Sequence, residues 1–100
     1  MNKKTSVPIP AITSLKTAVF LYHEKDELGN KEIRVLFGPL SNSKISELKK
    51  EVLKEMAIEN KMNRQAHAVN TEIAYKVWGL DIEDMEKRLA KIQKLNKLMA

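Results

Sequence analysis

The segment Trp78-Gly79-Leu80-Asp81 constrains the fold of this chain more than any other stretch. Gly79 can adopt the left-handed backbone conformation that ends a helix, and Leu80 can then pack back over the last helical turn. Asp81 offers a side-chain oxygen that can cap the first backbone N–H groups of a new helix. These signals predict one helix that ends near Trp78 and another that begins near Ile82, with almost no loop between them.

Two apolar segments ahead of this hinge have the composition of strands. Residues 16–23 are apolar and partly β-branched or aromatic, which is typical of a strand buried on both faces. Residues 31–37 carry apolar side chains at alternate positions, which is typical of a strand with one buried face. The polar residues 24–30 between them include Gly29 and Asn30 as a turn signal. The sequence therefore predicts a two-stranded β-hairpin.

A long helical stretch is expected after the hairpin. Gly38 and Pro39 end the second strand, and the polar residues 41–43 offer helix caps. Apolar side chains then recur at helical spacing up to the hinge, apart from a wholly polar stretch at residues 59–61. We expect either one long helix or two helices separated by a minor break at that stretch.

The predicted fold class is α+β, with an N-terminal two-stranded β-hairpin, a long helix and a shorter antiparallel C-terminal helix. A chain of 100 residues has the length of one domain. Pro8, Pro10 and several small polar residues predict a flexible N-terminal arm over residues 1–15. Residues 16–100 are then expected to form a single domain.

The last helix has the most regular apolar period in the chain. Its predicted protein-interface residues step by three and four positions, as in a coiled-coil seam: Ile82, Met85, Leu89, Ile92, Asn96 and Met99. An Asn buried in such a seam costs stability and can fix the register of the pairing helices. Alternatively, Leu95 and Leu98 take over the buried face and Asn96 points to water. The seam predicts self-association, with a dimer as the expected oligomer.

The same helix carries the whole excess of positive charge. The net charge is +5, and all 13 acidic residues precede residue 87. The last 14 residues contain five bases and no acid: Lys87, Arg88, Lys91, Lys94 and Lys97. This cluster is a candidate surface for nucleic acid or for an acidic protein. The other explanation is that acids at the start and bases at the end of a helix complement its dipole.

Residues 71–85 resemble a helix-turn-helix DNA-binding motif from Gly79 onward. The resemblance implies that the helix after the turn would enter the major groove between two phosphate backbones. The first half departs from the motif, because bulky Tyr75 stands where a small residue should face the second helix. The start of the second helix also carries four acids that phosphates would repel: Asp81, Glu83, Asp84 and Glu86.

Nothing in the sequence points to catalysis, a metal or a cofactor. There is no cysteine, which excludes disulfides, thiol catalysis and cysteine-ligated metals. His23 and His67 lack neighbours at metal-ligand spacing, and no glycine-rich phosphate loop is present. The longest apolar run is too short for an export signal or a membrane span. We therefore expect a cytoplasmic, non-enzymatic protein without cofactor or membrane contact.

These observations favour a small regulatory protein that self-associates and binds a partner protein through helical surfaces. The identity of that partner is not encoded in any motif of the chain. The alternative function is a small basic nucleic-acid-binding regulator that uses the cationic end of the last helix.

Overall fold

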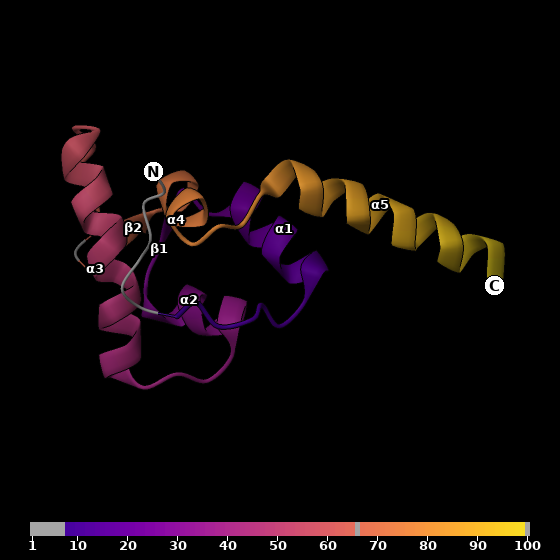
Figure 1. The fold of residues 1–100 in the computed structure, drawn as a ribbon, viewed down its shortest axis with the longest axis horizontal. Coiled ribbons are helices and arrows are strands. Elements are labelled where there is room, and N and C mark those ends of the chain that lie inside the picture. Colours follow the sequence, from indigo (N-terminus) through magenta and orange to yellow (C-terminus); the bar gives the residue numbers. More distant parts are fainter. Residues whose placement is uncertain (1–7, 66, 100) are drawn as a thin grey trace.

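The computed structural model describes residues 8–65 and 67–99 and is mostly helical (66%). The described part contains five helices: α1 (Leu15–Glu24), α2 (Asn30–Phe37), α3 (Asn42–Ile58), α4 (Thr71–Val77) and α5 (Ile82–Met99). Two short strands, β1 (Glu27–Leu28) and β2 (Val69–Asn70), pair antiparallel with Leu28 opposite Val69 and Glu27 opposite Asn70. The predicted α+β fold with an N-terminal hairpin is wrong, because this small sheet joins segments from the middle of a helical chain (Figure 1).

The first predicted strand, residues 16–23, lies instead within helix α1. The Ser14 hydroxyl accepts a hydrogen bond from the backbone N–H of Thr17 at 3.2 Å, which caps the helix. Ala18 and Leu21 are buried one helical turn apart. The apolar run therefore has a helical period, although it is also rich in residues that favour strands.

The second predicted strand, residues 31–37, is helix α2. The Glu32 carboxylate accepts the backbone N–H of Gly29 at 2.9 Å, so Gly29 begins a helix where a hairpin turn was expected. The buried residues follow the helical spacing: Ile33, Leu36 and Phe37. Val35 is exposed, so the alternation of apolar residues that predicted a strand does not correspond to a buried face.

The predicted long helix is two helices with far more than a minor break between them. Helix α3 ends because Asn60 adopts a left-handed conformation with φ of 59°. The backbone N–H of Lys61 then donates to the Met56 carbonyl at 2.8 Å, which closes the last turn of the helix. The described residues between α3 and β2, 59–65 and 67–68, form what we call the α3–β2 loop, and β2 leads directly into α4.

The predicted hinge between the last two helices is confirmed. Gly79 has φ of 76°, and the backbone N–H of Leu80 donates to the Tyr75 carbonyl at 2.8 Å. The Asp81 carboxylate accepts the backbone N–H of Asp84 at 3.2 Å and caps α5. Sequence and structure agree here because both signals are local.

The core lies where α1, α2, α3 and α4 meet. Trp78 is buried at the hinge and donates its indole N–H to the Leu48 carbonyl at 3.1 Å. Its ring meets that of Phe37 edge-on, with centroids 5.3 Å apart. Trp78, at the end of α4, therefore joins α4 to α2 and α3 within one packed cluster.

Residues 8–14 lead into α1 along the surface of the core. Ile9 and Ile12 pack against the core, and the backbone N–H of Thr13 donates to the Leu36 carbonyl at 2.8 Å. Residues 1–7 of the predicted flexible arm lie outside the described residues.

The prediction that the last helix is short and packs antiparallel to the long helix is wrong. With 18 residues α5 is slightly longer than α3, which has 17, and it packs on α1. Figure 1 shows α5 (orange to yellow) leaving the molecule beside α1, on the side away from α3. None of the described helices is both long and apolar enough to cross a membrane.

Candidate functional site

The first half of α5 is attached to the body of the protein by its apolar stripe. Met85 is buried, and Ile82 and Leu89, which lie on the same face, are half-buried. His23 at the end of α1 adds a polar contact, since its Nε2 lies 2.6 Å from a carboxylate oxygen of Glu86. These contacts fix the direction in which the rest of α5 leaves the body.

The second half of α5, residues 90–99, is exposed along its whole length, and we call it the free half. The apolar stripe nevertheless continues along it. Ile92 is 47% exposed and Met99 is 83% exposed. Leu95, at the edge of the stripe, is 51% exposed, and Leu98, further round the helix, is 75% exposed. Asn96 lies between Ile92 and Met99 and is also exposed. One stripe therefore begins inside the core at Met85 and ends in water at Met99.

An exposed stripe of this kind is unusual for a helix that ends a small domain. In water, an isolated helix of this length is marginal, and most helical stability in proteins comes from packing of the apolar face. The structure thus presents a preformed apolar surface with no covering element among the described residues. Exposed apolar patches rimmed by polar residues mark interaction sites in soluble proteins.

The five predicted cationic residues of α5 are all exposed: Lys87, Arg88, Lys91, Lys94 and Lys97. Arg88 pairs with Asp84 one turn earlier at 3.1 Å. No hydrogen bond or ion pair joins the four lysines to another described residue. At 100° per residue, most of these bases lie on the side of the helix opposite the apolar stripe. The helix thus carries an apolar face and a cationic face.

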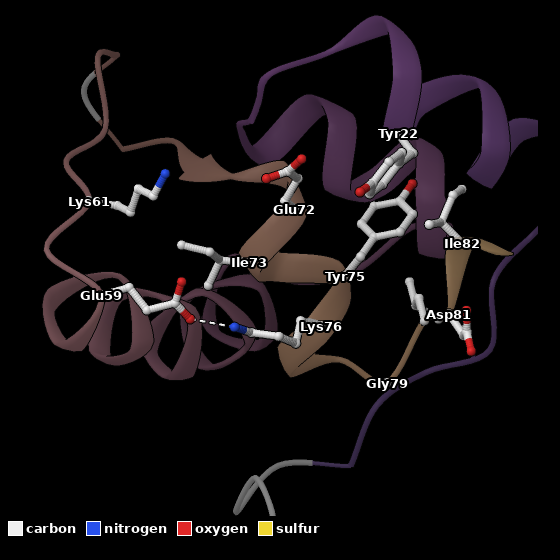
Figure 2. Close-up of a pocket in the computed structure, with 11 residues that line it drawn as sticks. Tyr22, Glu59, Lys61, Glu72, Ile73, Tyr75, Lys76, Gly79, Asp81 and Ile82 are labelled. Atoms are coloured by element: carbon white, nitrogen blue, oxygen red, sulfur yellow. Dashed lines mark hydrogen bonds and ion pairs between the residues drawn. The ribbon is translucent and has the colours of Figure 1, made fainter.

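A pocket lies between the end of α3, α4 and the start of α5. This pocket has a volume of about 620 Å³. Figure 2 shows the ion pair between Glu59 and Lys76 that spans one side of it, and this pair holds α4 to the end of α3. The same ion pair lowers the pKa of the Glu59 carboxyl and raises the pKa of the Lys76 ammonium. The Glu59 carboxylate and the Lys76 ammonium are therefore engaged with each other.

Tyr22 and Tyr75 line the other side of this pocket, with ring centroids 5.1 Å apart (Figure 2). The Tyr75 hydroxyl is buried and donates to the Ala18 carbonyl at 2.6 Å. Burial raises the pKa of Tyr75, and the neighbouring Tyr22 adds to the effect. Burial also raises the pKa of Tyr22, together with the charges of Glu72 and Glu86. Both phenols therefore stay protonated at a pH where an ordinary tyrosine ionises.

These raised pKa values predict that the protein loses stability in alkali. The unfolded chain releases the phenolic protons near pH 10, whereas the folded chain holds them. Between that pH and the raised pKa of Tyr75, the free energy of unfolding should fall by about 1.4 kcal/mol per pH unit on account of this residue. The Tyr75→Phe variant should show a slope smaller by that amount. Denaturant unfolding at a series of alkaline pH values measures it, and equal slopes in the two proteins would contradict the assignment.

No group of three or more His, Cys, Asp and Glu side chains within the described ranges is arranged to hold a metal ion. Comparison of the chain with protein-family models, with curated proteins and with solved structures finds no significant match.

The sequence prediction placed the interface on α5, and the structure divides those residues into two groups. Ile82, Met85 and Leu89 face the body of the protein, whereas Ile92, Asn96 and Met99 lie on the free half. Leu95 and Leu98 do not replace them in the core, since both are exposed. The 3–4 period of the sequence shows the stripe but contains no signal for the point at which α5 leaves the body.

Proposed function

We propose that this protein is a non-enzymatic, self-associating interaction protein, and that the free half of α5 pairs with the free half of α5 in a second copy. The observation that carries the proposal is the continuity of the apolar stripe, from Met85 in the core to Ile92 and Met99 in water. Two such helices would cover each other's exposed apolar side chains and remove them from water.

A second copy fits this stripe because the charges of α5 are complementary to those of an antiparallel α5. The first turns carry Glu83, Asp84 and Glu86, whereas residues 87–99 carry bases and no acid. An antiparallel pair brings the basic end of each helix toward the acidic start of the other. A parallel pair would instead turn the basic end of each helix toward the basic end of the other, which is less favourable. An antiparallel pair also has two-fold symmetry, so each copy uses the same surface and no further copy can be added. Two-fold dimers are the commonest protein oligomers.

Asn96 gives this pairing a means of setting its register. It interrupts the stripe between Ile92 and Met99, so a slipped pair would place its amide against apolar side chains. A polar residue at a single seam position is a known device for specifying register at a cost in stability.

The proposal includes the cytoplasm as location, because a chain without cysteine needs no oxidising compartment.

The Ile92→Asp variant tests this proposal. A charge at the centre of the free half should weaken the dimer about 30-fold, as expected for an interface residue that contributes about 2 kcal/mol. Ile92 lies beyond the body, so the fold and its helix content should be unchanged. The molar mass from light scattering, measured over a range of concentrations, gives the dissociation constant.

Ala90→Asp is the matched control, because it adds the same charge two residues earlier on an exposed side of the helix away from the stripe. It should dimerise nearly as well as the unmodified protein. A dissociation constant that is the same in both variants would contradict the proposed seam. A monomer whose stripe binds a different protein would also contradict it.

The second candidate function is nucleic-acid binding through the cationic face of α5. It is favoured by the four lysines of that face, which have no ion-pair partner among the described residues. Phosphates could then pair with these lysines while the opposite face holds the second copy. Binding of this kind weakens steeply with salt and is lost when those lysines become glutamine.

A further inference from the structure

A second surface, remote from the free half of α5, has the construction of a DNA-reading element. It begins with α2 and α3, which are joined only by residues 38–41. A turn of this length that contains a glycine is typical of a helix-turn-helix unit. In Figure 1 the two helices run across each other, with α3 on the outer edge of the molecule. The resemblance to a helix-turn-helix motif around Gly79 therefore has a counterpart earlier in the chain.

Side-chain contacts hold the turn between α2 and α3 in one conformation. Arg34 in α2 donates from Nε to the Leu40 carbonyl at 3.1 Å and from Nη2 to the Asn42 side-chain oxygen at 2.7 Å. The Ser41 hydroxyl accepts the backbone N–H of Lys44 at 3.1 Å and caps α3. The start of α3 is thus fixed relative to α2 before any ligand binds.

Helix α3 has one face in the core and one face in solvent. The buried face consists of Ile45, Leu48, Val52 and Met56. The opposite, exposed face begins with small polar residues and continues with bases: Ser43, Ser46, Glu47, Lys50 and Lys54. Small polar residues at the start of the helix allow close approach to base edges, and lysines further along can reach phosphates. We call this set the outer face of α3.

The α3–β2 loop lies beside the outer face and adds more positive charge. Lys49 of α3 ties the two together, since its Nζ donates to the His67 carbonyl at 2.6 Å and to the Asn30 side chain at 2.9 Å. The Glu27 carboxylate in β1 accepts backbone N–H groups of Arg64 and Gln65, which anchors the loop to the sheet. A hollow of about 450 Å³ separates this loop from α3.

The exposed charges of this combined surface suit a polyanion. Lys50 and Lys54 on α3 and Lys61 and Arg64 on the loop are exposed, and Glu47 is the one fully exposed acid among the described residues 42–65. Glu51, Glu55 and Glu59 are partly exposed, and Lys54 lies 3.8 Å from the Glu51 carboxylate. The start of α5, in contrast, carries Glu83, Asp84 and Glu86, with Asp81 directly before it. The repulsion from phosphates that argues against α5 as a DNA-reading helix is therefore smaller on the outer face of α3, which carries one fully exposed acid.

We propose that the outer face of α3 docks in the major groove of double-stranded DNA, with the α3–β2 loop against the adjacent phosphate backbone. A major groove of about 12 Å admits one α-helix, and the helix that follows the turn of a helix-turn-helix unit is the one that enters. Lys54, Lys61 and Arg64 contact phosphates, while Ser43 and Ser46 face base edges. This surface is separate from the free half of α5. A substitution can therefore abolish DNA binding without affecting self-association, and the reverse.

The test is fluorescence anisotropy of a labelled mixed-sequence DNA duplex titrated with the full-length protein at several salt concentrations. The unmodified protein should bind with a micromolar-range dissociation constant, typical of sequence-independent binding. The Lys54→Gln/Lys61→Gln variant should bind about tenfold more weakly at low salt. Its plot of log K against log salt should also be less steep by about 2.

The matched control is Lys16→Gln/Lys25→Gln, which removes the same charge from two exposed positions, one on α1 and one directly after it. It should bind the duplex like the unmodified protein. Lys91→Gln/Lys94→Gln removes the same charge from the cationic face of α5 and separates this proposal from the second candidate function. All six lysines are exposed, so the three variants should keep the helix content and oligomeric state of the parent. An equal or larger loss in the α5 variant would overturn the proposal in favour of the cationic helix. Absence of duplex binding, or binding of single strands alone, would also overturn it.

Discussion

Replacement of Trp78 by alanine should lower the free energy of unfolding by about 4 kcal/mol, within the range for truncation of a buried aromatic side chain. The indole is 4% exposed, contacts the ring of Phe37 and donates to the Leu48 carbonyl. Its removal opens a cavity between α2, α3 and the end of α4. Denaturant unfolding followed by circular dichroism measures the loss.

Trp78→Phe is the informative companion variant. It keeps most of the buried apolar area but cannot donate to the Leu48 carbonyl, so it should lose about 1–2 kcal/mol. A loss in Trp78→Ala no larger than that in Trp78→Phe would mean that the ring does not join the helices as described. Because Trp78 directly precedes the hinge, the direction in which α5 leaves the body depends on this packing.

Gly38→Ala should have the second largest effect, a loss of about 3 kcal/mol. Gly38 has φ of 96° and ψ of −174°, a region of backbone conformation that is essentially restricted to glycine. An added Cβ would lie 3.4 Å from the Thr13 methyl group, which is an ordinary contact, so the expected cost comes from the backbone. Thermal or denaturant unfolding measures it directly.

Gly79→Ala provides the control for Gly38→Ala, since φ at Gly79 is 76° and no other atom lies within 4 Å of an added Cβ. The left-handed region is less costly for alanine, so a loss of about 1 kcal/mol is expected. An equal loss of unfolding free energy in Gly38→Ala and Gly79→Ala would contradict the claim that the backbone conformation of Gly38 is the more costly one for alanine. A small effect at Gly38 would also weaken the argument that the α2–α3 turn has a fixed conformation.

Sequence patterns were reliable where the deciding interactions were local. The hinge was predictable because Gly79 and Asp81 act on backbone groups within a few residues. The same kind of signal was present at Glu32, three residues after Gly29, and at Asn60, and both mark helix ends. At Glu32 the helix signal competes with the alternation of apolar residues in 31–37, which favours a strand. At Asn60 it competes with the helical spacing of apolar residues on both sides of residues 59–61, which favours one continuous helix.

The rest of the fold depends on contacts between distant segments. The two strands are two residues each, too short to carry a periodic signal, and they pair because Leu28 and Val69 are both buried in the core. The alternation at residues 33, 35 and 37 was misleading because Val35 is an exposed apolar residue on a helix. Single exposed apolar residues are common on protein surfaces, and no pattern in one sequence identifies them.

The candidate surfaces were predictable to different degrees. The stripe and the bases of α5 were visible in the sequence because both follow the helical period. The outer face of α3 was not visible in the sequence. This surface exists because α3 ends at Ile58 and the α3–β2 loop folds back beside it. Recognition of Asn60 as a helix stop would have separated α3 from α4.

The central claim, that a second copy covers the free half of α5, is tested most directly by sedimentation equilibrium of the unmodified protein over a wide range of concentrations. The proposal predicts a reversible equilibrium that reaches twice the chain mass of 11.5 kDa. A molar mass that stays at that of one chain, up to the highest concentration at which the protein remains in solution, would contradict it.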